Sequence, residues 1–97
     1  MSSSPRITFS RTKDGSLEIS LNPAGRDLFV RQLQGLSEQS DHFHIMPEDM
    51  DPELPARNRP YGEGDAVIEW GKVLFRPDEW DEKHFPHVLG DTDPDVR

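Results

Sequence analysis

Residues 6–36 read RITFSRTKDGSLEISLNPAGRDLFVRQLQGL, and the pattern within this stretch decides the fold. Apolar and polar residues alternate on both sides of Asp14-Gly15, as they do in half-buried strands. Asp-Gly favours a tight hairpin turn because glycine accepts a positive φ without steric cost. The stretch therefore predicts an antiparallel hairpin with Ile7 and Phe9 on one face.

Asn22-Pro23 marks the start of a predicted helix directly after the hairpin. The Asn side chain can accept hydrogen bonds from the first amides of a helix, and Pro at the first helical position lacks a donor that would go unpaired. Phe29, Leu33 and Leu36 follow at i, i+4 and i+7, which places them on one apolar stripe. The sequence therefore predicts an amphipathic helix that packs on a sheet.

The segment 41–46, DHFHIM, predicts the next strand, with Phe43 and Ile45 in the core. The opposite face of this strand would carry His42, His44 and Met46.

The segment 65–76, DAVIEWGKVLFR, predicts a last strand that is apolar on both faces, and the segment 47–64 before it predicts a long loop. One helix covers only one face of a sheet. Ile68, Trp70 and Leu74 therefore need a different cover. The C-terminal tail, a second copy of the chain and a foreign protein are the alternatives.

Together these elements predict an α+β fold in the order β-β-α-β-β, with one amphipathic helix packed on an antiparallel or mixed sheet. Residues 1–97 would form a single domain, with an ordered core over about 6–80 and an acidic C-terminal tail over 81–97. Hydrophobic residues make up 32% of the chain, below the roughly 45–50% usual for globular domains, so the core must be small.

The charge of the chain is acidic and unevenly distributed. The net charge is −8, of which residues 1–37 contribute +2 and residues 38–97 contribute −10. This balance argues against a nucleic-acid partner, because binding to nucleic acid needs a basic face. The acidic half either keeps the protein soluble or steers it toward a basic protein partner. Without cysteine, and with no apolar run long enough for a membrane span or a signal peptide, a cytoplasmic protein is expected.

Two histidine pairs are the candidates for a metal site. His42 and His44 would lie on one side of a strand, and His84 and His87 could complete a site from the tail. The alternative is that these imidazoles form hydrogen bonds to their neighbours at the surface. Paired carboxylates are plentiful, but they cluster in the predicted loop and tail, where no rigid frame would hold them for acid–base catalysis. The sequence therefore predicts no catalytic residue, no metal and no cofactor.

Three stretches of the chain resemble a known family. They are SDHFHIMPE at 40–48, Gly62-Glu63-Gly64, and VIEWGKVLFRPDEW at 67–80. Their order and spacing resemble those of small immunity proteins from bacterial polymorphic-toxin systems, immunity family thirty-two, over roughly residues 17–80. The resemblance implies an α+β domain that is no enzyme. It implies instead a protein that binds a cognate toxin inside the cell that makes both and blocks the toxin's active site or another essential surface.

The acidic loop, the open strand face and the acidic segment around Trp80 are the expected contacts with such a toxin. A nuclease toxin has a basic substrate cleft, which an acidic inhibitor can occupy by charge complementarity. Trp80 either anchors the tail or serves as a recognition residue. The predicted partner-binding residues are His42, His44, Glu48, Asp49, Asp51, Glu53, Trp70, Glu79 and Trp80.

Two other classes of function remain open from the sequence. One is a homodimeric adaptor or regulatory subunit in which the open sheet faces of two copies pair. The other is a small metal-binding protein that uses His42 and His44.

Overall fold

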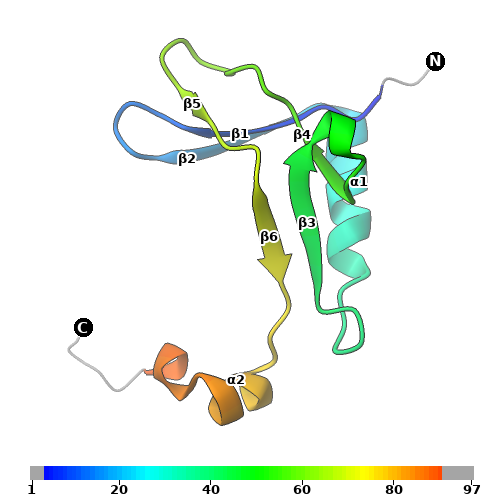
Figure 1. The fold of residues 1–97 in the computed structure, drawn as a ribbon, viewed down its shortest axis with the longest axis vertical. Coiled ribbons are helices and arrows are strands. Elements are labelled where there is room, and N and C mark those ends of the chain that lie inside the picture. Colours follow the sequence, from blue (N-terminus) through cyan, green and yellow to red (C-terminus); the bar gives the residue numbers. More distant parts are fainter. Residues whose placement is uncertain (1–3, 91–97) are drawn as a thin grey trace.

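Two three-stranded sheets and one long helix form the frame of the molecule (Figure 1). The computed structural model describes residues 4–90. The strand orders are β2-β1-β5 in the first sheet, which is antiparallel, and β4-β3-β6 in the second, which is mixed. The predicted α+β class is confirmed. The elements are β1 (Ile7–Arg11), β2 (Leu17–Leu21), α1 (Pro23–Gln34), β3 (His42–Pro47), the 3-10 helix η1 (Glu48–Met50), β4 (Leu54–Ala56), β5 (Ala66–Val67), β6 (Gly71–Leu74), α2 (Asp78–His84) and the 3-10 helix η2 (Pro86–Leu89).

The hairpin and the start of the helix form as the sequence predicts. β1 and β2 pair antiparallel, and Gly15 takes a φ of 90° in the turn between them. Asn22 caps α1, because its side-chain Oδ1 accepts from the backbone N–H of Gly25 at 2.7 Å. The same oxygen accepts from the N–H of Arg6 at 2.9 Å, so this single amide joins the hairpin to the helix.

α1 packs where the two sheets meet. The ring of Phe29 makes an edge-to-face contact with Phe9 of β1 at 6.2 Å between centroids, and another with Phe43 of β3 at 6.4 Å. Leu36 also packs against the core, whereas Leu33 is exposed, so the predicted stripe is correct except at Leu33. The buried core is small, as expected, and consists of Ile7, Phe9, Phe43, Ile45, Leu54 and Ala56.

The segment 65–76 is not one continuous strand, which corrects the prediction. Its first part, β5, pairs with β1, and the N–H of Ile68 donates to the carbonyl of Phe9 at 2.8 Å. Its second part, β6, pairs antiparallel with β3. Because the hairpin runs across the direction of β3 and β6 (Figure 1), the chain must leave one sheet before it can join the other. The break falls at Ile68, Glu69 and Trp70.

The predicted loop over 47–64 contains regular structure, which is a second correction. η1 leads into β4, which lies parallel to β3 with Leu54 and Ala56 buried. β4 pairs only with the last three residues of β3. A short connection is therefore enough to bring the chain back alongside β3 in the parallel direction. The left-handed conformation of Asp51, with φ of 57°, helps to turn the chain there. After β4, the N–H of Arg57 donates to the carbonyl of Ile7 at 2.9 Å and links the two sheets.

The C-terminal segment is also more regular than the predicted tail. α2 and η2 pack mainly against each other and project away from the sheets (Figure 1). The predicted acidic tail over 81–97 therefore begins inside α2, and its residues 91–97 lie outside the described part of the chain. Within residues 4–90, no helix is long and apolar enough to cross a membrane.

Candidate protein-binding surface

Residues 4–90 leave uncovered the face of the second sheet that points away from α1, and we call it the open face. On β3, Phe43 and Ile45 are buried toward the helix, as the sequence predicts. Because side chains alternate along a strand, His42 and His44 lie on the other side.

β6 adds its own side chains to the open face. In the antiparallel register His42 lies opposite Leu74, and His44 lies opposite Lys72, so these four side chains share one face. The side chain of Leu74 is 51% exposed, and that of Trp70, just before the strand, is 60% exposed. The described part of the C-terminal segment therefore leaves these residues accessible. Of the three covers that the sequence left open, the tail is excluded only as far as Gly90, because residues 91–97 lie outside the described part of the chain.

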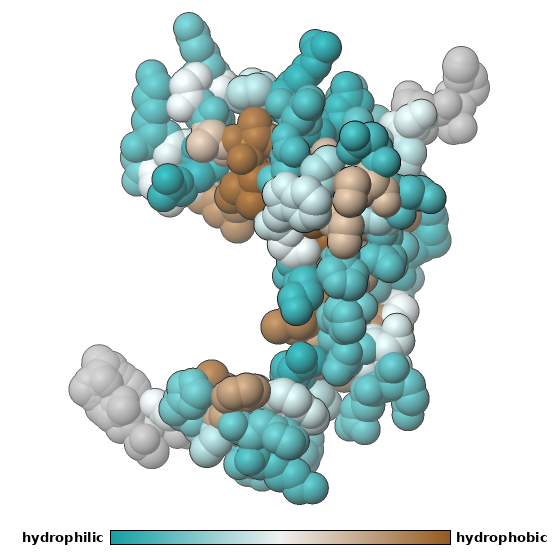
Figure 2. Space-filling view, in the orientation of Figure 1, coloured by the Kyte–Doolittle hydropathy of each residue, from teal (hydrophilic) through white to brown (hydrophobic). Residues whose placement is uncertain are grey.

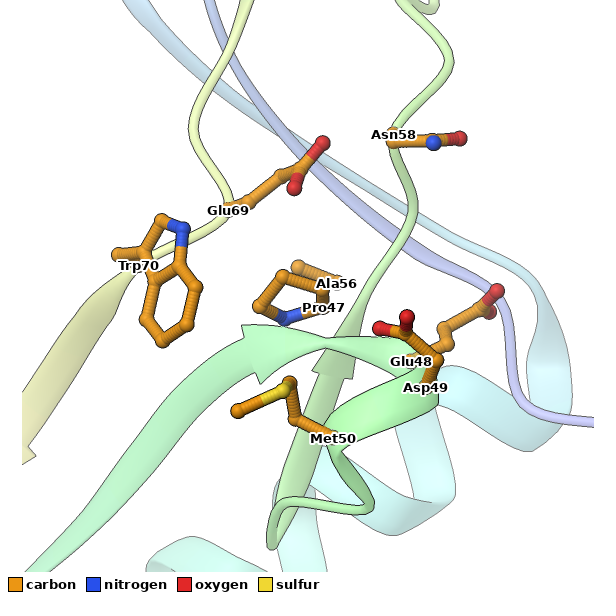
Figure 3. A pocket seen from close by; sticks show the side chains of 8 residues that line it. All are labelled: Pro47, Glu48, Asp49, Met50, Ala56, Asn58, Glu69 and Trp70. Atoms are coloured by element: carbon orange, nitrogen blue, oxygen red, sulfur yellow. The ribbon is translucent and has the colours of Figure 1, made fainter.

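A hollow of about 440 Å³ lies at one end of the open face, and we call it the Trp70 hollow. It forms where η1, the end of β3, β4 and the chain between β5 and β6 meet (Figure 3). Pro47 and Ala56 lie between the carboxylates of Asp49 and Glu69, and the indole ring of Trp70 borders them on one side (Figure 3). The lining residues are Pro47, Glu48, Asp49, Met50, Ala56, Asn58, Glu69 and Trp70.

The Trp70 hollow is negatively charged. The carboxylate of Glu48 lies 3.6 Å from Nε of Arg57 and is partly neutralised. Those of Asp49 and Glu69 form no ion pair with any residue between 4 and 90. An apolar wall beside free carboxylates suits a Lys or Arg side chain, whose stem is apolar and whose head is charged.

His44 and Glu53 form a contact across β3 and the start of β4. The backbone N–H of His44 donates to Oε1 of Glu53 at 3.0 Å, and the imidazole Nδ1 lies 3.4 Å from the same oxygen. The hydrogen bond from the His44 backbone lowers the pKa of the Glu53 carboxyl, because it stabilises the charged form.

Asp41, just before β3, pairs with two neighbouring side chains. Nδ1 of His42 donates to Oδ1 of Asp41 at 2.9 Å, and Nη1 of Arg76 donates to Oδ2 at 3.1 Å. The hydrogen bond from His42, with the nearby charge of Arg76, lowers the pKa of the Asp41 carboxyl. Through Arg76 this cluster also reaches the C-terminal segment.

A second hollow, of about 340 Å³, lies beside α2, and we call it the Trp80 hollow. The guanidinium of Arg76 lies 4.4 Å from the centroid of the Trp80 ring, a cation–π contact that contributes roughly 0.5–1 kcal/mol. The ring also packs against His84 and Phe85 of its own segment. Trp80 is therefore half-buried and anchors α2 to the end of β6. The lining residues are Glu38, Asp41, Phe75, Pro77, Glu79, Trp80, Lys83 and His84.

The structure does not assemble the histidines into a metal centre. The rings of His42 and His44 lie 5.0 Å apart in an edge-to-face arrangement, and each is close to a carboxylate. Across residues 4–90 no group of three or more His, Cys, Asp or Glu side chains could hold a metal ion. His84 and His87 belong to the C-terminal segment, where they contact aromatic rings.

Eight of the nine predicted partner-binding residues fall into three groups. Glu48, Asp49 and Trp70 line the Trp70 hollow, and Glu79 and Trp80 line the Trp80 hollow. His42 and His44 lie on the open face, with Glu53 beside His44. Asp51 lies outside both hollows, at the end of η1, where its N–H donates to the carbonyl of Glu48.

Sequence reasoning missed Glu69, Met50 and Asp41. Strict alternation would place Glu69 and Trp70 on opposite faces of a strand. Both line the same hollow because the chain is not a strand at that point. Glu69 could have been found from Gly71, because a glycine next to Glu69-Trp70 can mark an interruption of the strand.

Comparison of the chain with protein-family models, with curated proteins and with solved structures finds no match.

Proposed function

We propose that this protein is an immunity-type inhibitor that binds a basic protein toxin through the open face and the Trp70 hollow. The observation that carries the proposal is a tryptophan side chain that is 60% exposed beside carboxylates that have no ion-pair partner in residues 4–90. Exposed aromatic residues of this kind are typical of the centres of protein interfaces.

The amount of exposed apolar surface supports binding of a large partner. Among residues 4–90, six hydrophobic residues are buried, whereas thirteen large hydrophobic residues are exposed. Three of the thirteen, Met50, Trp70 and Leu74, lie on the open face or line the Trp70 hollow. A small molecule would cover little of such a surface, whereas a protein partner would cover most of it.

The charge supports a basic partner. The open face and both hollows are built from residues between 38 and 84, and the half of the chain that contains them, 38–97, has a net charge of −10. Complementary charge raises association rates, up to about 10⁸–10⁹ M⁻¹s⁻¹ for strongly steered pairs. The basic substrate cleft of a nuclease toxin has the required charge.

A homodimeric adaptor is the second candidate, and a different surface favours it. Leu17, Ile19 and Leu21 form an exposed apolar row along β2, which is the outer strand of the first sheet. Pairing of this row with the same row of a second copy would leave the open face free. Light scattering of the purified protein shows directly whether it is a dimer or a monomer.

Co-expression with candidate toxin domains from the genes that neighbour this chain's gene tests the proposed function. We expect one of them to be neutralised, so that growth is restored, and to co-purify with this chain. Trp70→Ala and Glu69→Lys should each weaken that complex by about tenfold or more, because they remove an anchor and reverse a charge in the hollow.

The matched control is Val30→Ala, which truncates another exposed apolar side chain, on α1 and therefore on the other side of the sheet from the open face. It should leave binding unchanged. Failure of every encoded toxin domain both to be neutralised and to co-purify would overturn the proposed function.

A further inference from the structure

β6 is an edge strand whose outward backbone groups can be identified. The N–H of Phe75 donates to the carbonyl of Asp41 at 2.7 Å, so this pair is hydrogen-bonded in the ladder. Pairs in an antiparallel ladder alternate between hydrogen-bonded and non-hydrogen-bonded. Val73 therefore directs its N–H and C=O toward β3, and Lys72 and Leu74 direct theirs away from it.

The outer edge of β6 is accessible to another chain. β6 has β3 on one side and no strand on the other within the described chain. Figure 2 shows a wide notch between the arm built by the hairpin and the C-terminal helices, and β6 lies at its base in the orientation of Figure 1. The exposed side chains of Trp70 and Leu74 flank the outward backbone groups.

We propose that the partner protein adds an extended, basic segment to β6 as a fourth strand of the sheet β4-β3-β6. This inference rests on the proposed function and specifies how the partner binds. Backbone hydrogen bonds to Lys72 and Leu74 would hold the segment, and its alternate side chains would contact Trp70 and Leu74.

Charge complementarity argues for a basic segment. Glu69 precedes the strand, and the acidic first turn of α2, with Asp78 and Glu79, follows it. Of the two basic side chains in between, that of Arg76 is already paired with Asp41. A Lys or Arg of the added segment would reach the carboxylates of the Trp70 hollow.

The same charges argue against a second copy at this edge. Two β6 strands paired antiparallel would bring the acidic flanks of both copies together, over a strand of only four residues. β2 also has an outer edge, but the charges on the hairpin and the start of α1 balance, with Arg11, Lys13 and Arg26 against Asp14, Glu18 and Asp27, so this edge attracts a basic segment less.

Hydrogen exchange of the complex with the neutralised toxin domain tests the inference. The amides of Lys72 and Leu74 should exchange rapidly in the free chain and about tenfold or more slowly in the complex. The amide of Val73, which already bonds to β3, is the internal control and should change little. A complex in which the amides of Lys72 and Leu74 still exchange rapidly would overturn this inference and leave the proposed function standing.

Two substitutions at one position provide an independent measurement. Lys72→Pro removes the outward N–H without removing a bond to β3, and it should weaken the complex by about tenfold or more. Lys72→Ala keeps the N–H and should bind at least as tightly as the wild type. Equal binding by both variants would overturn the inference, as would protection of the Lys72 and Leu74 amides in a dimer of the free chain. If no toxin domain forms a complex, both the inference and the proposed function fail.

Discussion

The backbone N–H of Phe75 lies 2.7 Å from the carbonyl oxygen of Asp41, and this hydrogen bond closes the ladder between β6 and β3 at its far end. The side chain of Asp41 meanwhile binds His42 and Arg76. Asp41 thus fixes which backbone groups of β6 point toward β3, and it also positions the segment that leads to α2.

Phe29 joins the two sheets, so its loss should destabilise the whole molecule. Phe29→Ala removes a ring that contacts both Phe9 and Phe43, and we expect the free energy of unfolding to fall by about 3 kcal/mol. Leu33→Ala, at an exposed position of the same helix, should cost less than about 1 kcal/mol. Urea unfolding followed by circular dichroism measures both values. Equal costs would show that α1 packs through Leu33 after all.

Gly25 allows α1 to approach β1 closely. A Cβ at this position would lie 2.6 Å from the carbonyl oxygen of Arg6 and 2.9 Å from Cγ1 of Ile7. Gly25→Ala should therefore lower the free energy of unfolding by about 1–3 kcal/mol, although alanine favours helices. Gly35→Ala is the control, because a Cβ there meets its nearest atom at 3.5 Å. Thermal unfolding of the wild type and both variants measures these effects. An unchanged midpoint for Gly25→Ala would contradict the close packing.

Ser10 has a buried hydroxyl without a hydrogen-bond partner among residues 4–90. Burial of an unpaired hydroxyl costs free energy, so Ser10→Ala should raise the free energy of unfolding by about 1 kcal/mol or leave it unchanged. Denaturant titration of the variant measures this change. A clear loss of stability would mean that the hydroxyl is bonded in solution.

The Asp41 cluster should make stability depend on pH in the acidic range. The folded pKa of Asp41 lies below the ordinary value, first through the hydrogen bond from His42 and also through the charge of Arg76. The cluster therefore stabilises the fold at pH values above the ordinary aspartate pKa, and this contribution is lost as the pH falls through the lowered folded value.

Carboxyl NMR titration tests this prediction directly. The midpoint for Asp41 should lie below that of an unstructured aspartate, and it should rise in the variant His42→Ala. The stability difference between wild type and Asp41→Asn should shrink as the pH falls through the folded pKa. A midpoint that His42→Ala does not move would contradict the assigned cause.

Local patterns in the sequence were enough to predict the hairpin, the capped helix and the strand of Phe43 and Ile45. Each of these depends on neighbouring residues: a turn dipeptide, a cap, or an alternation that places one face in the core. The same alternation put His42, His44 and Met46 on the open face. The acidic charge of the second half of the chain follows from composition alone.

Only the tertiary structure decided how these elements divide into two sheets. The apolar run over 65–76 fits one long strand equally well, because local alternation says nothing about which partner a strand finds. Long-range hydrogen bonds to Phe9 and Asp41 place its two parts in different sheets. That division brings Glu69 and Trp70 into one hollow and leaves the edge of β6 unpaired.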